Sequence, residues 1–186
     1  MAKHKDIPVF SRRLCIFVGI IPLLFVLYAC PFSSQYKLDK DPSVPVDESL
    51  LGKWATTITN KKGKEQPVKM ILSKKNDDEY YMDLLGNFSD LKSYRITKND
   101  SIRASAYLSM VADRPFLNIQ VKGLTYISAV VYKNDTLSLL PIADGFTAKY
   151  IKSNTDLRKA LEIHIRTRVF PRYDEQFCLR KMLREN

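Results

Sequence analysis

Few residues of this chain have the types and the spacing that a reaction centre requires. The domain that follows an apolar leader contains one histidine, His164, with no second histidine at the spacing of a metal ligand. Its carboxylates gather at Asp77-Asp78-Glu79, a run without the regular oxygen spacing and glycine turn of a calcium loop. No glycine-rich phosphate loop and no Gly-x-Ser-x-Gly motif occurs. The sequence therefore predicts a protein that is not an enzyme and that needs no cofactor or metal.

The residue best placed for a defined modification is Cys30, which ends an apolar run. Residues 1–13 are polar and end in two arginines, and Leu14–Ala29 then continues for 16 residues without a charge. As a helix this run extends about 24 Å, which is short of the roughly 30 Å hydrocarbon core of a bilayer. A basic start, a short apolar core and a small residue before the cut are typical of a secretory signal peptide. We predict an N-terminal hydrophobic helix within a signal peptide of residues 1–29.

The end of the run, Leu27-Tyr28-Ala29-Cys30, resembles the lipobox of bacterial lipoproteins. The resemblance implies attachment of a diacylglyceryl group to the Cys30 thiol, acyl chains such as palmitate, and cleavage before this residue. Two or more acyl chains make a stable membrane anchor. The resemblance thus places the protein in the bacterial cell envelope, with a membrane as its partner. The alternatives are an uncleaved transmembrane helix that ends at Cys30, and export through a twin-arginine signal.

Residues 30–49 are predicted to form a lipidated cysteine and a flexible tether. The stretch contains three prolines and no apolar period. Prolines fix φ and withhold backbone donors, so we expect an extended and solvated spacer that reaches at most about 60 Å. The domain proper is then expected over residues 50–186.

Apolar residues of this domain repeat with a period of two. In Ser101–Val111, Ile102, Ala104, Ala106 and Leu108 alternate with polar side chains, as in a half-buried strand. Similar runs recur about every eight to twelve residues, separated by turn signals such as Lys122-Gly123 and Asn134-Asp135. This spacing predicts a mainly β fold, an antiparallel meander barrel of about eight strands.

One helix is expected after the meander. Ser153–Asp156 offers capping side chains, Leu157, Leu161 and Ile165 recur on one face, and Pro171 stops the helix. Glu162 and Arg166 are spaced as a favourable ion pair. Phe177–Leu183 is predicted to be a final strand.

A β meander, one amphipathic helix and a final strand, in this order, resemble the lipocalin barrel. Gly52-Lys53-Trp54 in the first strand resembles the Gly-x-Trp motif that closes the barrel floor in that family. The resemblance implies that an arginine of the last strand, Arg180 or Arg184, stacks over Trp54. The Thr-Asp-Tyr motif of typical lipocalins is absent.

Two functions remain open. The small residues Ala104 and Ala106, with Leu108, face the predicted interior and indicate a cavity for a small apolar ligand; alternatively Phe116 or the helix fills that space. The second function is a structural or interaction lipoprotein with a packed core, which binds an envelope protein through its surface. The mature part has 26 basic and 19 acidic side chains, an excess of seven. In an exported protein this excess favours anionic headgroups or an acidic partner over nucleic acid.

Overall fold

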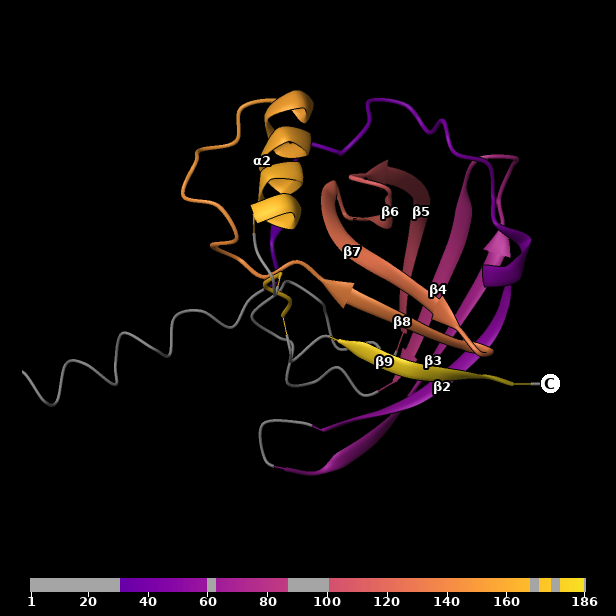
Figure 1. The fold of residues 1–186 in the computed structure, drawn as a ribbon. Coiled ribbons are helices and arrows are strands. Elements are labelled where there is room, and N and C mark those ends of the chain that lie inside the picture. The colour runs from indigo at the N-terminus through magenta and orange to yellow at the C-terminus, as the bar shows by residue number, and fades with distance from the viewer. Residues whose placement is uncertain (1–30, 60–62, 87–100, 168–170, 175–177, 186) are drawn as a thin grey trace, which may run out of the picture.

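The computed structural model describes residues 31–59, 63–86, 101–167, 171–174 and 178–185, which form a closed antiparallel barrel (Figure 1). Eight strands pair in chain order, and the last of them closes the barrel by pairing with both the first and the seventh. These strands are β2 (Gly52–Thr59), β3 (Glu65–Lys74), β4 (Tyr80–Gly86), β5 (Ser101–Val111), β6 (Arg114–Val121), β7 (Leu124–Lys133), β8 (Thr136–Pro141) and β9 (Leu179–Glu185).

The predicted antiparallel barrel of about eight strands is therefore confirmed. One detail differs, because the final strand was expected in addition to the barrel and is instead its eighth member. It begins and ends two residues later than predicted. The predicted hydrophobic helix and Cys30 lie outside the described residues.

Two of the predicted turn signals form tight hairpin turns. Asn134 and Asp135 both have positive φ (51° and 53°), as do Lys122 (48°) and Gly123 (81°). Two-residue turns with this backbone match the twist of the strands that they join. The hairpin between β5 and β6 turns through Ala112 and Asp113, also at positive φ (48° and 59°). Aspartate tolerates this backbone, whereas alanine rarely adopts it.

The alternating residues of the meander fill the inside of the barrel. Side chains at alternate positions of each strand meet across the pairs, as Met70 does with Trp54 and Tyr80 with Ala106. They form one cluster of buried residues: Leu50, Trp54, Val68, Met70, Leu72, Tyr80, Met82, Ala104, Ala106, Leu108, Leu117, Ile119, Val130, Leu137, Leu139, Leu179 and Met182.

A second core lies outside the barrel, beneath α2 (Asn154–Thr167). The helix buries Leu157, Leu161 and Ile165, as the sequence predicts, against outward-facing residues of the strands, including Phe116 and Ile127. Its Glu162 and Arg166 form the expected ion pair (3.0 Å). Because this cover shields the outer face of the wall as well, consecutive residues of β5 to β7 are buried, which a half-buried alternation does not predict.

The prediction that residues 30–49 form a solvated tether is wrong for the described part, residues 31–49. This part, which we call the strap, begins with a bridge between Pro31 and Ala143 and continues as β1 (Ser33–Ser34), which pairs with β7. Leu38 is 2% exposed in the outer core. The strap then crosses the barrel and ends in a short 3-10 helix, η2 (Glu48–Leu50), beside β2 (Figure 1).

The tether was mispredicted because its apolar residues have no period. Leu38, Val44 and Val46 are spaced to fit the barrel beneath them and do not follow a helix or strand repeat. The prolines favour an extended backbone along the barrel wall. The wall provides the packing and hydrogen-bonding partners of this backbone. The folded domain therefore begins at Pro31, one residue after the predicted lipidation site.

Replacing Leu38 by alanine tests whether the strap belongs to the fold. We expect Leu38→Ala to lower the free energy of unfolding by about 2–4 kcal/mol, because it leaves a cavity in the outer core. Ser43→Ala, at an exposed position of the same strap, is the control and should change it by less than about 0.5 kcal/mol. Denaturant unfolding measures both, and equal, near-zero effects would show that the strap behaves as a tether.

Candidate functional site

The floor of the barrel is built around Trp54. The indole is fully buried, its Nε1 donates a hydrogen bond to the Leu50 carbonyl (2.9 Å), and its ring meets the edge of Tyr132 (6.1 Å between centroids). The guanidinium carbon of Arg184, from β9, lies 4.7 Å from the centroid of the Trp54 ring. The stacking expected from an arginine of the last strand is therefore present, with Arg184 as the arginine.

Arg184 also joins three parts of the chain. Its Nη1 donates to the Leu51 carbonyl (3.0 Å), and its Nη2 donates to the carbonyl of Ser49 in the strap. A Cβ at Gly52 would lie 3.3 Å from Nη1, and Gly52 has a φ of 130°, so a side chain there is both crowded and strained. Arg180, the other arginine considered for stacking on Trp54, is exposed, and its backbone carbonyl accepts a hydrogen bond from the Thr56 hydroxyl (3.0 Å).

The three residues expected to line a ligand cavity face the interior among large neighbours. Ala104 pairs with Met82, Ala106 pairs with Tyr80, and Leu108 lies in the same cluster. The cross-strand neighbours of both alanines are therefore large, buried side chains of β4, and Phe116 packs in the outer core. The Tyr80 hydroxyl accepts a hydrogen bond from the Asp47 amide (2.6 Å), and burial raises the pKa of Tyr80 to about 12.

The end of the barrel away from the floor has partly exposed apolar side chains. Ile58, Leu84, Ile102, Val121 and Tyr126 pack against the inner core but remain only partly buried. They come from five strands, so the wall presents an apolar ring at this end. The arrangement suits contact with an apolar molecule.

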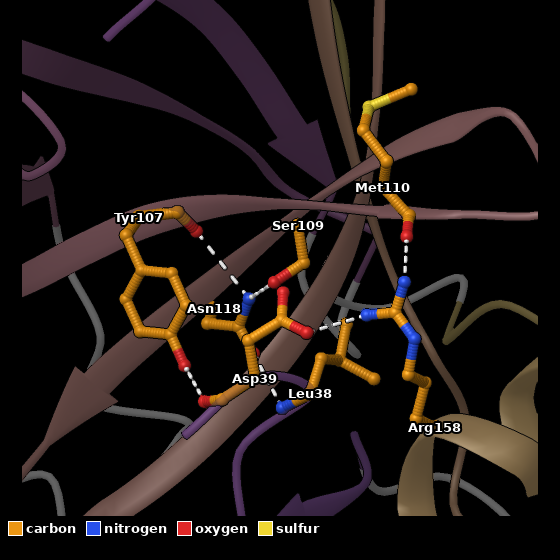
Figure 2. A network of polar contacts seen from close by, with 7 residues as sticks. All are labelled: Leu38, Asp39, Tyr107, Ser109, Met110, Asn118 and Arg158. Carbon is orange, nitrogen blue, oxygen red and sulfur yellow. Dashed lines mark hydrogen bonds and ion pairs between the residues drawn. The ribbon is translucent and has the colours of Figure 1, made fainter. Parts of the chain in front are cut away.

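The strap is held to the outside of the barrel by a network of buried polar groups (Figure 2). Asn118 is fully buried; its Oδ1 accepts from the Leu38 amide (3.0 Å), and its Nδ2 donates to Ser109 Oγ (2.8 Å) and the Tyr107 carbonyl (3.4 Å). The Tyr107 hydroxyl donates to the Asp39 carbonyl (2.8 Å), and burial raises its pKa, which keeps it a neutral donor.

An ion pair ties this network to the helix. Arg158 of α2 binds the Asp39 carboxylate (2.6 Å) and also donates to the Met110 carbonyl. The Asn154 side chain at the start of α2 accepts from the Lys37 amide (3.3 Å). These contacts join the strap, the barrel wall and α2 to one another, so the network is structural.

A groove of about 290 Å³ lies between the strap and the loop that joins β8 to α2. Phe32 and Phe146, which meet edge to face (4.9 Å between centroids), line it together with Lys149 and Tyr150. It is lined by residues 32–36, 144–147 and 149–151. Its volume is at the lower limit of small-molecule sites, and its polar side chains largely serve local turns, as the Thr147 hydroxyl does for the Lys149 amide.

The remaining candidates for chemistry are packed into the fold. His164 is 3% exposed, accepts a hydrogen bond at Nε2 from the Arg172 amide (3.0 Å) and meets the Phe146 ring at its edge. Cys178 is a buried thiol. Within the described ranges, no group of three or more His, Cys, Asp or Glu side chains is arranged to hold a metal ion.

No family model, curated protein or solved structure matches this chain. In the part of the chain that the structure describes, no helix is both long and apolar enough to cross a membrane.

The sequence prediction missed the strap and the groove. The signal for the groove was two aromatic residues, Phe32 and Phe146, that lie 114 positions apart and meet only in the folded chain. The signal for the strap was Asn118, a polar residue within the otherwise apolar run Phe116–Ile119, whose hydrogen-bonding groups needed partners from elsewhere.

Removing the Arg184 guanidinium tests the floor. We expect Arg184→Ala to lower the free energy of unfolding by about 1–3 kcal/mol, because the stacking on Trp54 and two hydrogen bonds are lost together. The emission of Trp54, the single tryptophan, should shift to the red as water reaches the ring. Arg180→Ala is the matched control from the same strand and should leave this emission unchanged; a shift of equal size in both variants would contradict a specific role for Arg184.

Proposed function

We propose that this protein is a bacterial lipoprotein in which lipid on Cys30 holds a lipocalin-like barrel directly against a membrane of the cell envelope. The observation that carries this proposal is the position of Pro31. Pro31 pairs with Ala143, and the Phe32 amide donates to the Ile142 carbonyl (2.8 Å). Cleavage at the lipobox would therefore remove the leader and leave every residue that the barrel uses.

The position of Pro31 also sets the length of the anchor. Consecutive Cα atoms are about 3.8 Å apart, so a lipid on Cys30 is attached within one residue of the folded wall. We propose a barrel that lies at the headgroups, with no spacer. An uncleaved helix over Leu14–Ala29 is the alternative form of attachment.

The lipocalin-like assignment is supported by the barrel floor and by chain order. Trp54 lies in the first strand of the barrel, Arg184 in the last, and one helix precedes that last strand. The crowded inner core beside Ala104 and Ala106 favours a role performed by the surface, as a non-enzymatic interaction lipoprotein of the envelope. The partner on this reading is an envelope component and not nucleic acid.

Metabolic labelling with a clickable fatty acid tests the anchor. The wild-type chain should be labelled and should migrate as the cleaved form, and Cys30→Ala should lose the label and retain the leader. Cys178→Ala is the matched control, since that thiol is buried, and it should keep the label. Label that remains on Cys30→Ala would refute lipidation at this residue and favour an uncleaved helix.

A second candidate function is the binding of a small apolar molecule at the end of the barrel away from Trp54. The specific observation in its favour is the partly exposed ring that includes Ile102 and Tyr126. Burial of apolar surface supplies about 25 cal/mol for each Å², so a fatty acid or a similar chain inserted there would gain affinity from this ring alone.

Dye binding separates this candidate from the first. If the ring binds apolar molecules, an environment-sensitive hydrophobic dye should bind the wild-type protein and be displaced by fatty acids. Ile102→Lys should weaken the dye affinity by roughly tenfold or more, because a charge would enter the ring. Ile163→Lys, at an exposed position on α2 (53% exposed), is the control. Absence of dye uptake by a folded wild-type protein would exclude this function.

A further inference from the structure

The surface next to the start of the strap has a defined composition. Pro31 pairs with Ala143, whose amide donates to the Arg172 carbonyl (3.1 Å). The loop between β8 and α2 lies on the same side, since Phe146 packs on Phe32. Figure 1 shows this loop projecting from the barrel beside the helix. Two segments, the loop and the residues around Arg172, thus adjoin the point where the strap begins.

These segments present cations around one exposed aromatic residue. Tyr150 is 79% exposed, the highest value among the large apolar side chains that the structure describes as exposed. Lys149 and Lys152 lie on either side of it in the chain, and both are exposed, as is Arg172. We call Lys149, Tyr150, Lys152 and Arg172 the anchor-side patch.

The acids near this patch are few and partly engaged. The Asp156 carboxylate binds the Lys149 ammonium (3.5 Å) and accepts from the Lys152 amide (3.3 Å), while the Asp156 amide donates to Ser153 Oγ (3.0 Å). Desolvation raises the pKa of this carboxyl, but its hydrogen bonds with Ser153 and Lys152 and the Lys149 charge outweigh that effect and hold the pKa below its ordinary value.

Asp144 uses Oδ1 to cap the Gly145 amide (2.9 Å). Asp174, two residues after Arg172, is buried (4% exposed), and Asp156 is partly buried, which leaves Asp144 as the exposed carboxylate that the structure describes beside three exposed cations. The described charges of these segments that face solvent are therefore mainly positive.

The opposite end of the strap has the reverse charge. Asp47 and Glu48 lie in or next to η2, and the Val46 amide donates to the carbonyl of Asp77 in the acidic turn 77–79 (2.8 Å). Lys74 binds both Asp77 (3.0 Å) and Glu48 (3.8 Å), yet five carboxylates in segments 47–48 and 77–79 outnumber the two lysines at 74 and 75. In Figure 1 η2 lies across the barrel from the loop that carries Tyr150.

We infer that the anchor-side patch rests on the anionic phospholipid headgroups of the membrane, with Tyr150 inserted at the interface. The inference depends on the proposed lipid at Cys30, which would bring this face of the barrel to the bilayer. Tyrosine prefers the interfacial region, and each lysine near an anionic surface favours binding. The acidic end is repelled by the same surface, so charge sets the orientation of the barrel as well as its contact.

The test uses full-length chain, processed in bacteria and reconstituted in vesicles of phosphatidylcholine with or without phosphatidylglycerol. Tyr150→Trp reports contact through quenching by brominated phospholipid, while the native Trp54 is fully buried and gives a constant background. Tyr81→Trp, at an exposed position on β4 (46% exposed), is the matched control. We expect quenching of Trp in Tyr150→Trp alone, and stronger quenching with phosphatidylglycerol.

Charge reversal tests the electrostatic part. Lys149→Glu with Lys152→Glu, in the Tyr150→Trp background, should lower the ratio of docked to undocked protein by at least about tenfold. Lys53→Glu with Lys133→Glu, at exposed positions of β2 and β7, is the control and should leave the quenching intact. Quenching that is equal with and without phosphatidylglycerol would overturn the role of anionic headgroups.

The remaining outcomes separate this inference from the anchor. A chain that fails to float with vesicles has no lipid anchor, and both proposals fall. A chain that floats while Tyr150→Trp is unquenched keeps the anchor and overturns the patch. Equal quenching of Tyr81→Trp overturns a preferred orientation. Cross-linking of the patch to an envelope protein, without lipid quenching, would assign the surface to a protein partner instead.

Discussion

The arrangement of this molecule depends on the hydrogen bonds of one buried side chain, Asn118. An amide buried in a β wall is costly unless its donors and acceptors are satisfied. Ser109 and the Tyr107 carbonyl satisfy the donor side, and the Leu38 amide of the strap satisfies the acceptor. The strap is therefore fixed in register on the outside of the barrel, and the barrel needs the strap to bury this group without loss.

Several features follow from that register. With Leu38 seated, the apolar part of the strap continues the outer core that α2 begins, and Asp39 reaches Arg158 on the helix. At one end the strap leads to η2 and the carbonyl groups that Arg184 binds above Trp54. At the other end it begins at Pro31 beside Ala143. The strap thus connects the floor of the barrel to the side where the chain enters.

Because the strap is fixed to the barrel, the proposed lipid anchor would also restrict how the barrel is oriented on the membrane. A lipid at the end of a loose tether would leave the barrel free to turn above the membrane. A lipid one residue from a fixed strand limits the faces that reach the bilayer, and the cations around Tyr150 lie on the favoured side. In the proposed orientation the acidic end and the exposed outer wall would face away from the membrane, where the proposed interaction lipoprotein would meet its partners.

The resemblance of Gly52-Lys53-Trp54 to the lipocalin motif implied that an arginine of the last strand covers Trp54, and the sequence alone determined the elements of the barrel and the helix with its buried face. These features depend on period, capping and turn residues, which act over short distances along the chain. Only the tertiary structure decided that residues 31–49 belong to the domain, that Tyr80 and Met82 are the cross-strand neighbours of Ala106 and Ala104, and that Arg184 rather than Arg180 covers Trp54. The physical reason is that an irregular segment such as the strap has no pattern of its own, because its conformation is set by the surface and the buried polar groups against which it packs.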